Sequence, residues 1–67
     1  MNKNPQHLIK LLETKGYLLR RITGSHHILF HKELRKTIVV PVHSKKDIPN
    51  GTFLSILKQA GISKEEI

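Results

Sequence analysis

The first apolar positions of the chain have the spacing of one face of a helix. These positions are Leu8, Ile9, Leu11 and Leu12. Residues three and four positions apart lie on the same side of a helix, so the pattern predicts an amphipathic helix with one buried face. Asn4 is a suitable N-cap and Pro5 suits the first turn, while Gly16 favours the left-handed conformation that ends many helices. We therefore predict a helix that begins at Pro5 and is capped at Gly16.

The pattern then changes to short apolar runs that are typical of strands. Residues 17–22, 26–31 and 36–40 form these runs, and the last is the clearest because it is rich in β-branched residues. The alternation in residues 17–22 is imperfect. Residues 23–25 have turn chemistry, and residues 32–35 provide a second reversal of the chain. Short strands with tight connections predict an antiparallel meander.

A polar loop over residues 41–50 separates the strands from a second helix. That helix is predicted to begin at a position from 50 to 52 and to stop at Gly61. Its apolar face consists of Phe53, Ile56, Leu57 and Ala60. Ser63 and Glu66 match a capping box, which predicts a short helical turn near the C-terminus.

The order of these elements predicts an α+β fold of the type α-β-β-β-α. In it, two helices pack on one face of a three-stranded antiparallel sheet, which is the layout of double-stranded-RNA-binding domains. A chain of 67 residues has room for one such unit, so we expect a single domain over residues 1–67.

Composition narrows the classes of function. The formal net charge is +7, and a basic excess of this size on a small surface attracts polyanions. Nucleic acid is the favoured partner, and an acidic protein or an anionic membrane ranks after it. No helix has the basic amphipathic face of a membrane-surface segment. Cysteine is absent, which excludes disulfides and thiolate metal sites. The first residues are polar and the apolar runs are too short for a signal sequence or a membrane span, so we expect a cytoplasmic protein.

Several short segments, taken in their order and spacing, resemble the HicA toxin family. They are Gly16-Tyr17, Gly24-Ser25-His26-His27, Val39-Val40-Pro41-Val42-His43, Ile48-Pro49-Asn50-Gly51-Thr52 and Ile56-Leu57-Lys58-Gln59-Ala60-Gly61. The similarity extends over residues 8–62. It implies a toxin that cleaves RNA, including messenger RNA, and we expect this cleavage to need no cofactor. It further implies neutralisation by a HicB-type antitoxin, through which the protein would form oligomers.

The resemblance also assigns the catalytic residue. The family's histidine follows a glycine and a small residue, which corresponds to His26 after Gly24 and Ser25, whereas His27 is not a fixed feature. One segment departs from the family, because residues 32–35 stand where an Asp-Gly or similar turn is common. That departure leaves the geometry of the second hairpin open.

The residues around His26 suit RNA cleavage on chemical grounds. RNA carries its own nucleophile, the 2′-hydroxyl, and histidine exchanges protons near neutral pH. Gly24 lets the backbone approach a phosphate, and Ser25 offers a hydroxyl group. Lys45 and Lys46 are the best candidates for contacts with the RNA backbone, because a loop can reach a groove. Other candidate cations are Arg20, Arg21, Lys36 and Lys58, and for each cation a merely solvated surface is the alternative.

Other histidines and aromatic residues have simpler interpretations. On a strand, His27 and His31 would share a face but lie about 13 Å apart, which is too far for both to ligate one ion directly. His26 would point to the opposite face. We therefore expect no metal site. His7 is expected to be a solvated helix residue. Tyr17 and Phe30 could stack on bases, but we favour positions in the core for both.

Two further classes of function stay open from the residues alone. The α-β-β-β-α layout also suits a non-catalytic double-stranded-RNA-binding module. The basic surface also suits a protein-interaction domain. In either case His26 would only fill a half-buried strand position.

Overall fold

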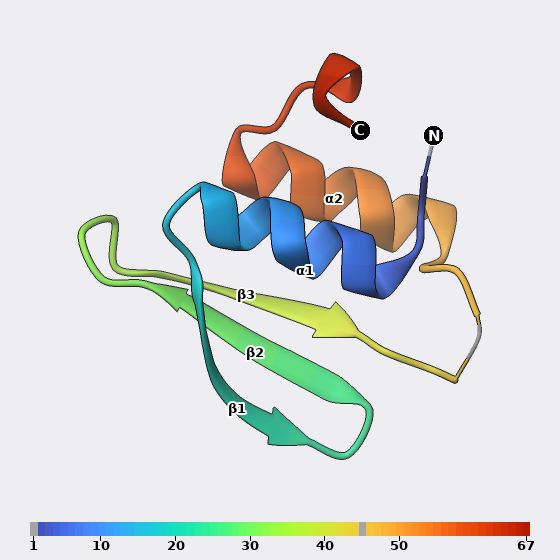
Figure 1. Ribbon diagram of the computed structural model, residues 1–67, viewed down its shortest axis with the longest axis horizontal. Helices are drawn as coiled ribbons and strands as arrows, with labels where there is room; N and C mark the ends of the chain where they lie inside the picture. The colour runs from blue at the N-terminus through green and yellow to red at the C-terminus, as the bar shows by residue number, and fades with distance from the viewer. Residues whose placement is uncertain (1, 45) are drawn as a thin grey trace.

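The computed structural model describes residues 2–44 and 46–67 and has the predicted order of elements. These are α1 (Pro5–Thr14), β1 (Leu18–Thr23), β2 (His26–His31), β3 (Lys36–Pro41), α2 (Asn50–Ala60) and the short 3-10 helix η1 (Lys64–Glu66). The strands form one antiparallel sheet in the order β1-β2-β3. Both helices lie on the same side of this sheet (Figure 1). The α+β fold predicted from the sequence is therefore confirmed.

The ends of α1 follow the predicted capping signals. The side-chain oxygen of Asn4 accepts hydrogen bonds from the backbone N–H groups of Gln6 and His7, at 2.8 and 3.3 Å. At the other end Gly16 has φ +99°, and the N–H of Tyr17 donates to the carbonyl of Leu12 at 3.1 Å. These bonds satisfy backbone groups that a helix end otherwise leaves without partners.

The core lies between the helices and the inner face of the sheet, the face that the helices cover. Its members are Leu8, Ile9, Leu12, Tyr17, Leu29, Ile38, Val40, Ile48, Phe53, Ile56, Leu57 and Ile62. The helix faces and the burial of Tyr17 agree with the sequence prediction. The core position expected for Phe30 is wrong: it is only half-buried, because it follows Leu29 in β2 and alternation turns it to the opposite, outer face. There the guanidinium carbon of Arg20 lies 4.9 Å from the centre of the Phe30 ring.

β1 is the strand that contributes no buried residue to this core. Its register with β2 shifts between Leu19 and Arg21, which leaves Arg20 as the extra residue of a bulge and explains the imperfect alternation of residues 17–22. All six of its residues are exposed. In Figure 1, β1 lies at the edge of the sheet away from the two helices.

The turn between β2 and β3 keeps a left-handed residue although it has no glycine. Arg35 has φ +52° and is the only non-glycine residue with a positive φ in the described part of the chain. The backbone N–H of Leu34 donates to Nδ1 of His31 at 3.1 Å. The His31 ring also makes an edge-on contact with Tyr17, with ring centres 5.0 Å apart. The His31 side chain thus stabilises a turn whose left-handed position is more commonly occupied by glycine.

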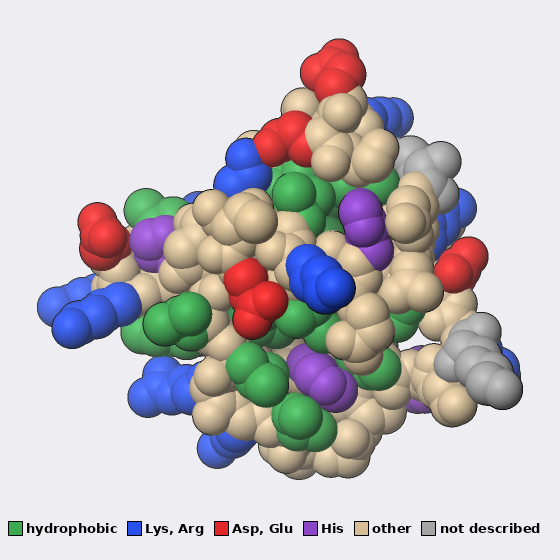
Figure 2. Space-filling view, viewed as in Figure 1, with side chains coloured by type: hydrophobic (Ala, Val, Ile, Leu, Met, Phe, Trp, Pro, Cys, Tyr) green, Lys and Arg blue, Asp and Glu red, His purple; other side chains and the backbone are tan. Residues whose placement is uncertain are grey.

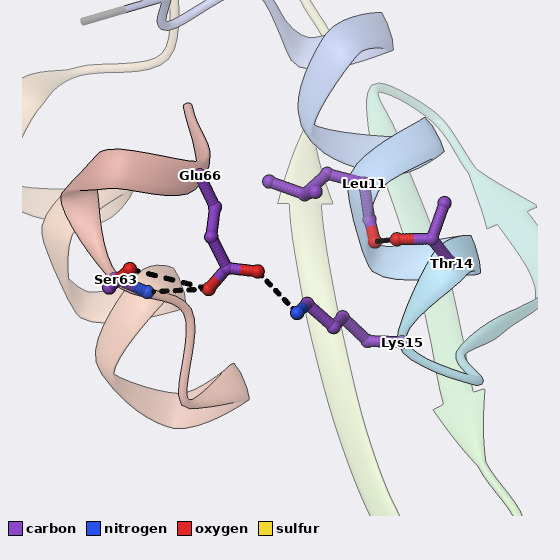
Figure 3. Close-up of polar contacts among 5 residues, drawn as sticks. All are labelled: Leu11, Thr14, Lys15, Ser63 and Glu66. Atoms are coloured by element: carbon purple, nitrogen blue, oxygen red, sulfur yellow. Dashed lines mark hydrogen bonds and ion pairs between the residues drawn. The ribbon is translucent and has the colours of Figure 1, made fainter.

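The C-terminal segment is held against the end of α1. Ser63 and Glu66 form the predicted capping box, in which the N–H of Ser63 donates to a carboxylate oxygen of Glu66 at 2.9 Å (Figure 3). The other oxygen of that carboxylate pairs with the ammonium group of Lys15. Lys15, together with the Ser63 N–H, lowers the pKa of Glu66 from its usual value. This pair links η1 to the residue that follows α1.

Candidate active site

His26 is the first residue of β2 and lies on the outer face of the sheet. It pairs with Thr23 of β1 and with Pro41 of β3. Since Leu29, three positions along, is buried on the inner face, alternation directs His26 away from the helices. Its side chain is exposed. A strand that is paired on both sides therefore presents a solvent-accessible imidazole.

Gly24 and Ser25 form the turn that leads into His26. Gly24 has φ +58°, a backbone conformation that residues other than glycine rarely adopt. No atom lies within 4 Å of a Cβ built at this position. The carbonyl of Ser25 accepts a hydrogen bond from the N–H of Val42 at 2.6 Å. This bond fixes the start of the loop after β3 beside the turn. The next residue in that loop is His43, which is exposed.

The structure describes one member of the predicted lysine pair, Lys46. Lys45 lies outside the described residues. Lys46 is exposed, and its N–H donates to the carbonyl of His43 at 3.0 Å. A hollow beside Lys46 is lined by Asn4, Pro5, Gln6, Val42, His43, Ser44, Lys46 and Asp47. Lys46 therefore lies near the start of α1, and it is connected to the His26 turn through Val42 and Ser25.

Two other cations share the outer face with His26. Arg21 pairs with Ile28, two residues from His26, and the Arg20 side chain covers Phe30 on the same face. A second hollow is lined by Arg20, Arg21, Ile28 and Thr37. The sequence analysis included both arginines among six candidate cations but ranked Lys45 and Lys46 ahead of them. Only the strand register, which the bulge alters, shows that they lie with His26.

The three strands carry no acidic side chain. Asp and Glu occur at Glu13, Glu33, Asp47, Glu65 and Glu66, which lie in α1, in the hairpin turn, in the loop before α2 and in the C-terminal segment. Strand residues contribute Arg20, Arg21 and Lys36, besides histidines. The sheet is thus a basic surface, which favours contact with anionic groups.

The fold separates three of the other histidines, His7, His27 and His31, from His26. His27 and His31 belong to the inner side of β2, where Nδ1 of His27 is buried without a hydrogen-bond partner in the described structure. His7 is exposed on α1, as predicted. Within residues 2–44 and 46–67, no three His, Asp or Glu side chains gather in a way that could hold a metal ion.

Comparison with known proteins identifies the family of this chain. No curated protein matches the chain. The family model described as the HicA toxin of bacterial toxin–antitoxin systems matches residues 5–62. That match spans α1, the three strands, α2 and the turn at His26. The chain therefore belongs to the HicA toxin family of bacterial toxin–antitoxin systems.

Proposed function

We propose that this toxin is an endoribonuclease that cleaves messenger RNA by proton transfer at His26, without a metal ion. The observation that carries the proposal is the exposed imidazole at the start of a doubly paired strand, on an outer face without acidic residues. A rigid element holds the ring, and the surrounding charge attracts the substrate. No helix in the described part of the chain is long and apolar enough to cross a membrane. Messenger RNA as the substrate would place the activity of the toxin in the cytoplasm.

The reaction uses the hydroxyl group that RNA itself supplies. His26 removes the proton of a 2′-hydroxyl, whose oxygen forms a bond to the adjacent phosphorus while the bond from phosphorus to the 5′-oxygen breaks. The departing 5′-oxygen takes up a proton. The products are one fragment ending in a 2′,3′-cyclic phosphate and another beginning with a 5′-hydroxyl.

Cations around His26 would hold the phosphate and offset the charge of the transition state. Arg21 is best situated, because it lies on the same face two residues along β1 from Thr23, the partner of His26. The Gly24 backbone and the Ser25 hydroxyl would contact the RNA beside the turn, while Lys45 and Lys46 would bind its backbone farther along. Arg21 suits the role of holding the phosphate, since the planar guanidinium group of arginine can donate two hydrogen bonds to phosphate oxygens.

His43 is our candidate for the group that protonates the leaving oxygen. The pairing of His26 with Pro41 and the bond from Val42 to Ser25 bring the loop to the same end of the sheet as His26. His43 follows immediately and is exposed. One histidine would then act as base and the other as acid.

Cleavage of RNA by the purified toxin tests the main proposal. We expect cleavage to persist in EDTA and to weaken steeply as salt rises, because contacts with phosphates release counterions. Fragments should carry 2′,3′-cyclic phosphates, which mass spectrometry identifies. Activity that a chelator abolishes and a divalent ion restores would contradict the mechanism. Binding of RNA without any cleavage would instead indicate the non-catalytic module.

A substrate with an activated leaving group tests His43. We expect His43→Ala to lower RNA cleavage about 100-fold. The same variant should cleave uridine 3′-(4-nitrophenyl phosphate) nearly as fast as the wild type, because nitrophenolate departs without a proton. His7→Ala is the matched control and should change neither rate. Equal losses of His43→Ala on both substrates would show that His43 is not the acid.

We also propose that the antitoxin of the pair is a HicB-type protein. The family membership implies an antitoxin partner. An acidic protein would complement the net charge of +7 and give a complex that contains more than one chain.

A further inference from the structure

β1 exposes large aliphatic side chains on both of its faces. Leu18 is 68% exposed and pairs with Phe30 on the outer face. Leu19 and Ile22 are 44% and 54% exposed and pair with Leu29 and His27 on the inner side. We call Leu18, Leu19 and Ile22, with the bulge residue Arg20 and its neighbour Arg21, the β1 surface. In Figure 2, hydrophobic side chains are exposed over the part of the sheet that the helices leave uncovered.

The fold leaves these side chains largely uncovered. β1 is an edge strand, hydrogen-bonded to β2 on one side only within the described chain. The buried strand residues, by contrast, are all in β2 and β3. An exposed apolar edge strand is a site for pairing with another chain, and a contiguous apolar patch on a small protein marks an interaction surface. Beside it, a mostly apolar hollow is lined by Leu18, Leu19, Arg20, Phe30 and Lys32.

We infer that the antitoxin docks on the β1 surface through a segment that carries apolar and acidic side chains and pairs with the free edge of β1. The inference rests on the antitoxin partner of the proposed function. Arg20 and Arg21 interrupt the apolar residues, and no strand carries an acid, so carboxylates of the partner complement this surface. Apolar anchors surrounded by charge are typical of protein interfaces.

The same observations argue against RNA and against a second copy of this chain as the occupant of the β1 surface. RNA bases bind best to aromatic faces, whereas Leu18, Leu19 and Ile22 are aliphatic and the one aromatic ring nearby, that of Phe30, is already covered by Arg20. A second copy of this chain paired edge to edge would bring the arginines of both copies together. Like charges at such an interface are unfavourable.

This surface shares Arg21 with the candidate active site but does not include His26. Thr23, at the end of β1, is the partner of His26. An antitoxin seated on β1 would therefore lie beside His26, while the aliphatic residues that hold it take no part in the proposed chemistry. Recognition of the antitoxin and cleavage of RNA should then be separable by substitution.

The test compares Ile22→Ser with Leu34→Ser, a matched control. Ile22 and Leu34 are 54% and 55% exposed, but Leu34 lies in the turn between β2 and β3. The probe is the purified HicB-type antitoxin of the proposed pair, titrated into a cleavage assay and, separately, into the toxin alone by calorimetry. We expect Ile22→Ser to raise the Kd for the antitoxin about 10- to 100-fold, as loss of an interface anchor does. Leu34→Ser should leave the Kd unchanged, and both variants should cleave RNA and melt like the wild type.

Each other outcome has a distinct meaning. Equal Kd values for Ile22→Ser and the wild type would overturn the inference, as would a wild-type dimer that Ile22→Ser dissociates with no change in antitoxin binding. Loss of RNA binding by folded Ile22→Ser would also overturn it and assign the surface to RNA. If the wild type cleaves no RNA while calorimetry still shows weaker antitoxin binding by Ile22→Ser, the ribonuclease proposal fails and this inference stands.

Discussion

Replacement of His26 by alanine is expected to lower the rate of RNA cleavage by about 10²- to 10⁴-fold, the usual contribution of a positioned acid or base. The fold should be unaffected, because His26 is exposed and lies outside the core. Single-turnover cleavage of a labelled RNA measures the rate. A binding assay with the same RNA separates a defect in chemistry from a defect in affinity, which should change little.

His7→Ala is the control for the loss of an exposed imidazole elsewhere on the molecule. It should cleave like the wild type. His26→Gln, which keeps a polar side chain of similar size but cannot transfer a proton near neutral pH, should be as inactive as His26→Ala. Unchanged cleavage by either His26 variant would remove His26 from the mechanism.

The replacement of Gly16 by alanine is expected to destabilise the protein strongly. A Cβ at this position would lie 2.7 Å from Nε2 of His31, and φ is +99°. His31 cannot move away freely, since it accepts the Leu34 N–H and contacts Tyr17. Backbone strain of this kind alone costs about 1–3 kcal/mol, which is a large part of the stability of so small a domain. Urea denaturation followed by circular dichroism gives the change in the free energy of unfolding.

Gly51→Ala is the matched control for that experiment. Gly51 lies in the first turn of α2, has no atom within 4 Å of a built Cβ and has no positive φ. Alanine has the higher helix propensity, so this variant should be as stable as the wild type or slightly more stable. A Gly16→Ala protein that is also as stable as the wild type would show that His31 moves aside at little cost.

The elements of this fold were predictable where their signals are local. Asn4 and Gly16 mark the two ends of α1, and they were predictable because capping depends on neighbouring backbone groups. The Ser63–Glu66 capping box has the same local character. The boundaries of β2 were also predicted correctly, so His26 was expected where it lies, at the start of a strand. Its role remains a proposal.

What the sequence did not reveal depends on pairing between segments. The bulge at Arg20 changes which residues of β1 share a face with His26, and no local pattern marks it. Phe30 was expected in the core because an aromatic residue in a small strand is usually buried. Its face is set instead by Leu29, its buried neighbour. The contact between Val42 and Ser25, which brings His43 to the same end of the sheet, likewise exists only after the sheet has formed.

The position of β1 outside the core also determines which part of the sheet opens first. Its hydrogen bonds to β2 are reinforced by no buried side chain of its own, so local opening should expose its amides to hydrogen exchange long before those of β3. Thr23, which borders His26, belongs to this strand. One wall of the candidate active site is therefore its most easily opened part, while the imidazole itself is carried by a strand held in place on both sides.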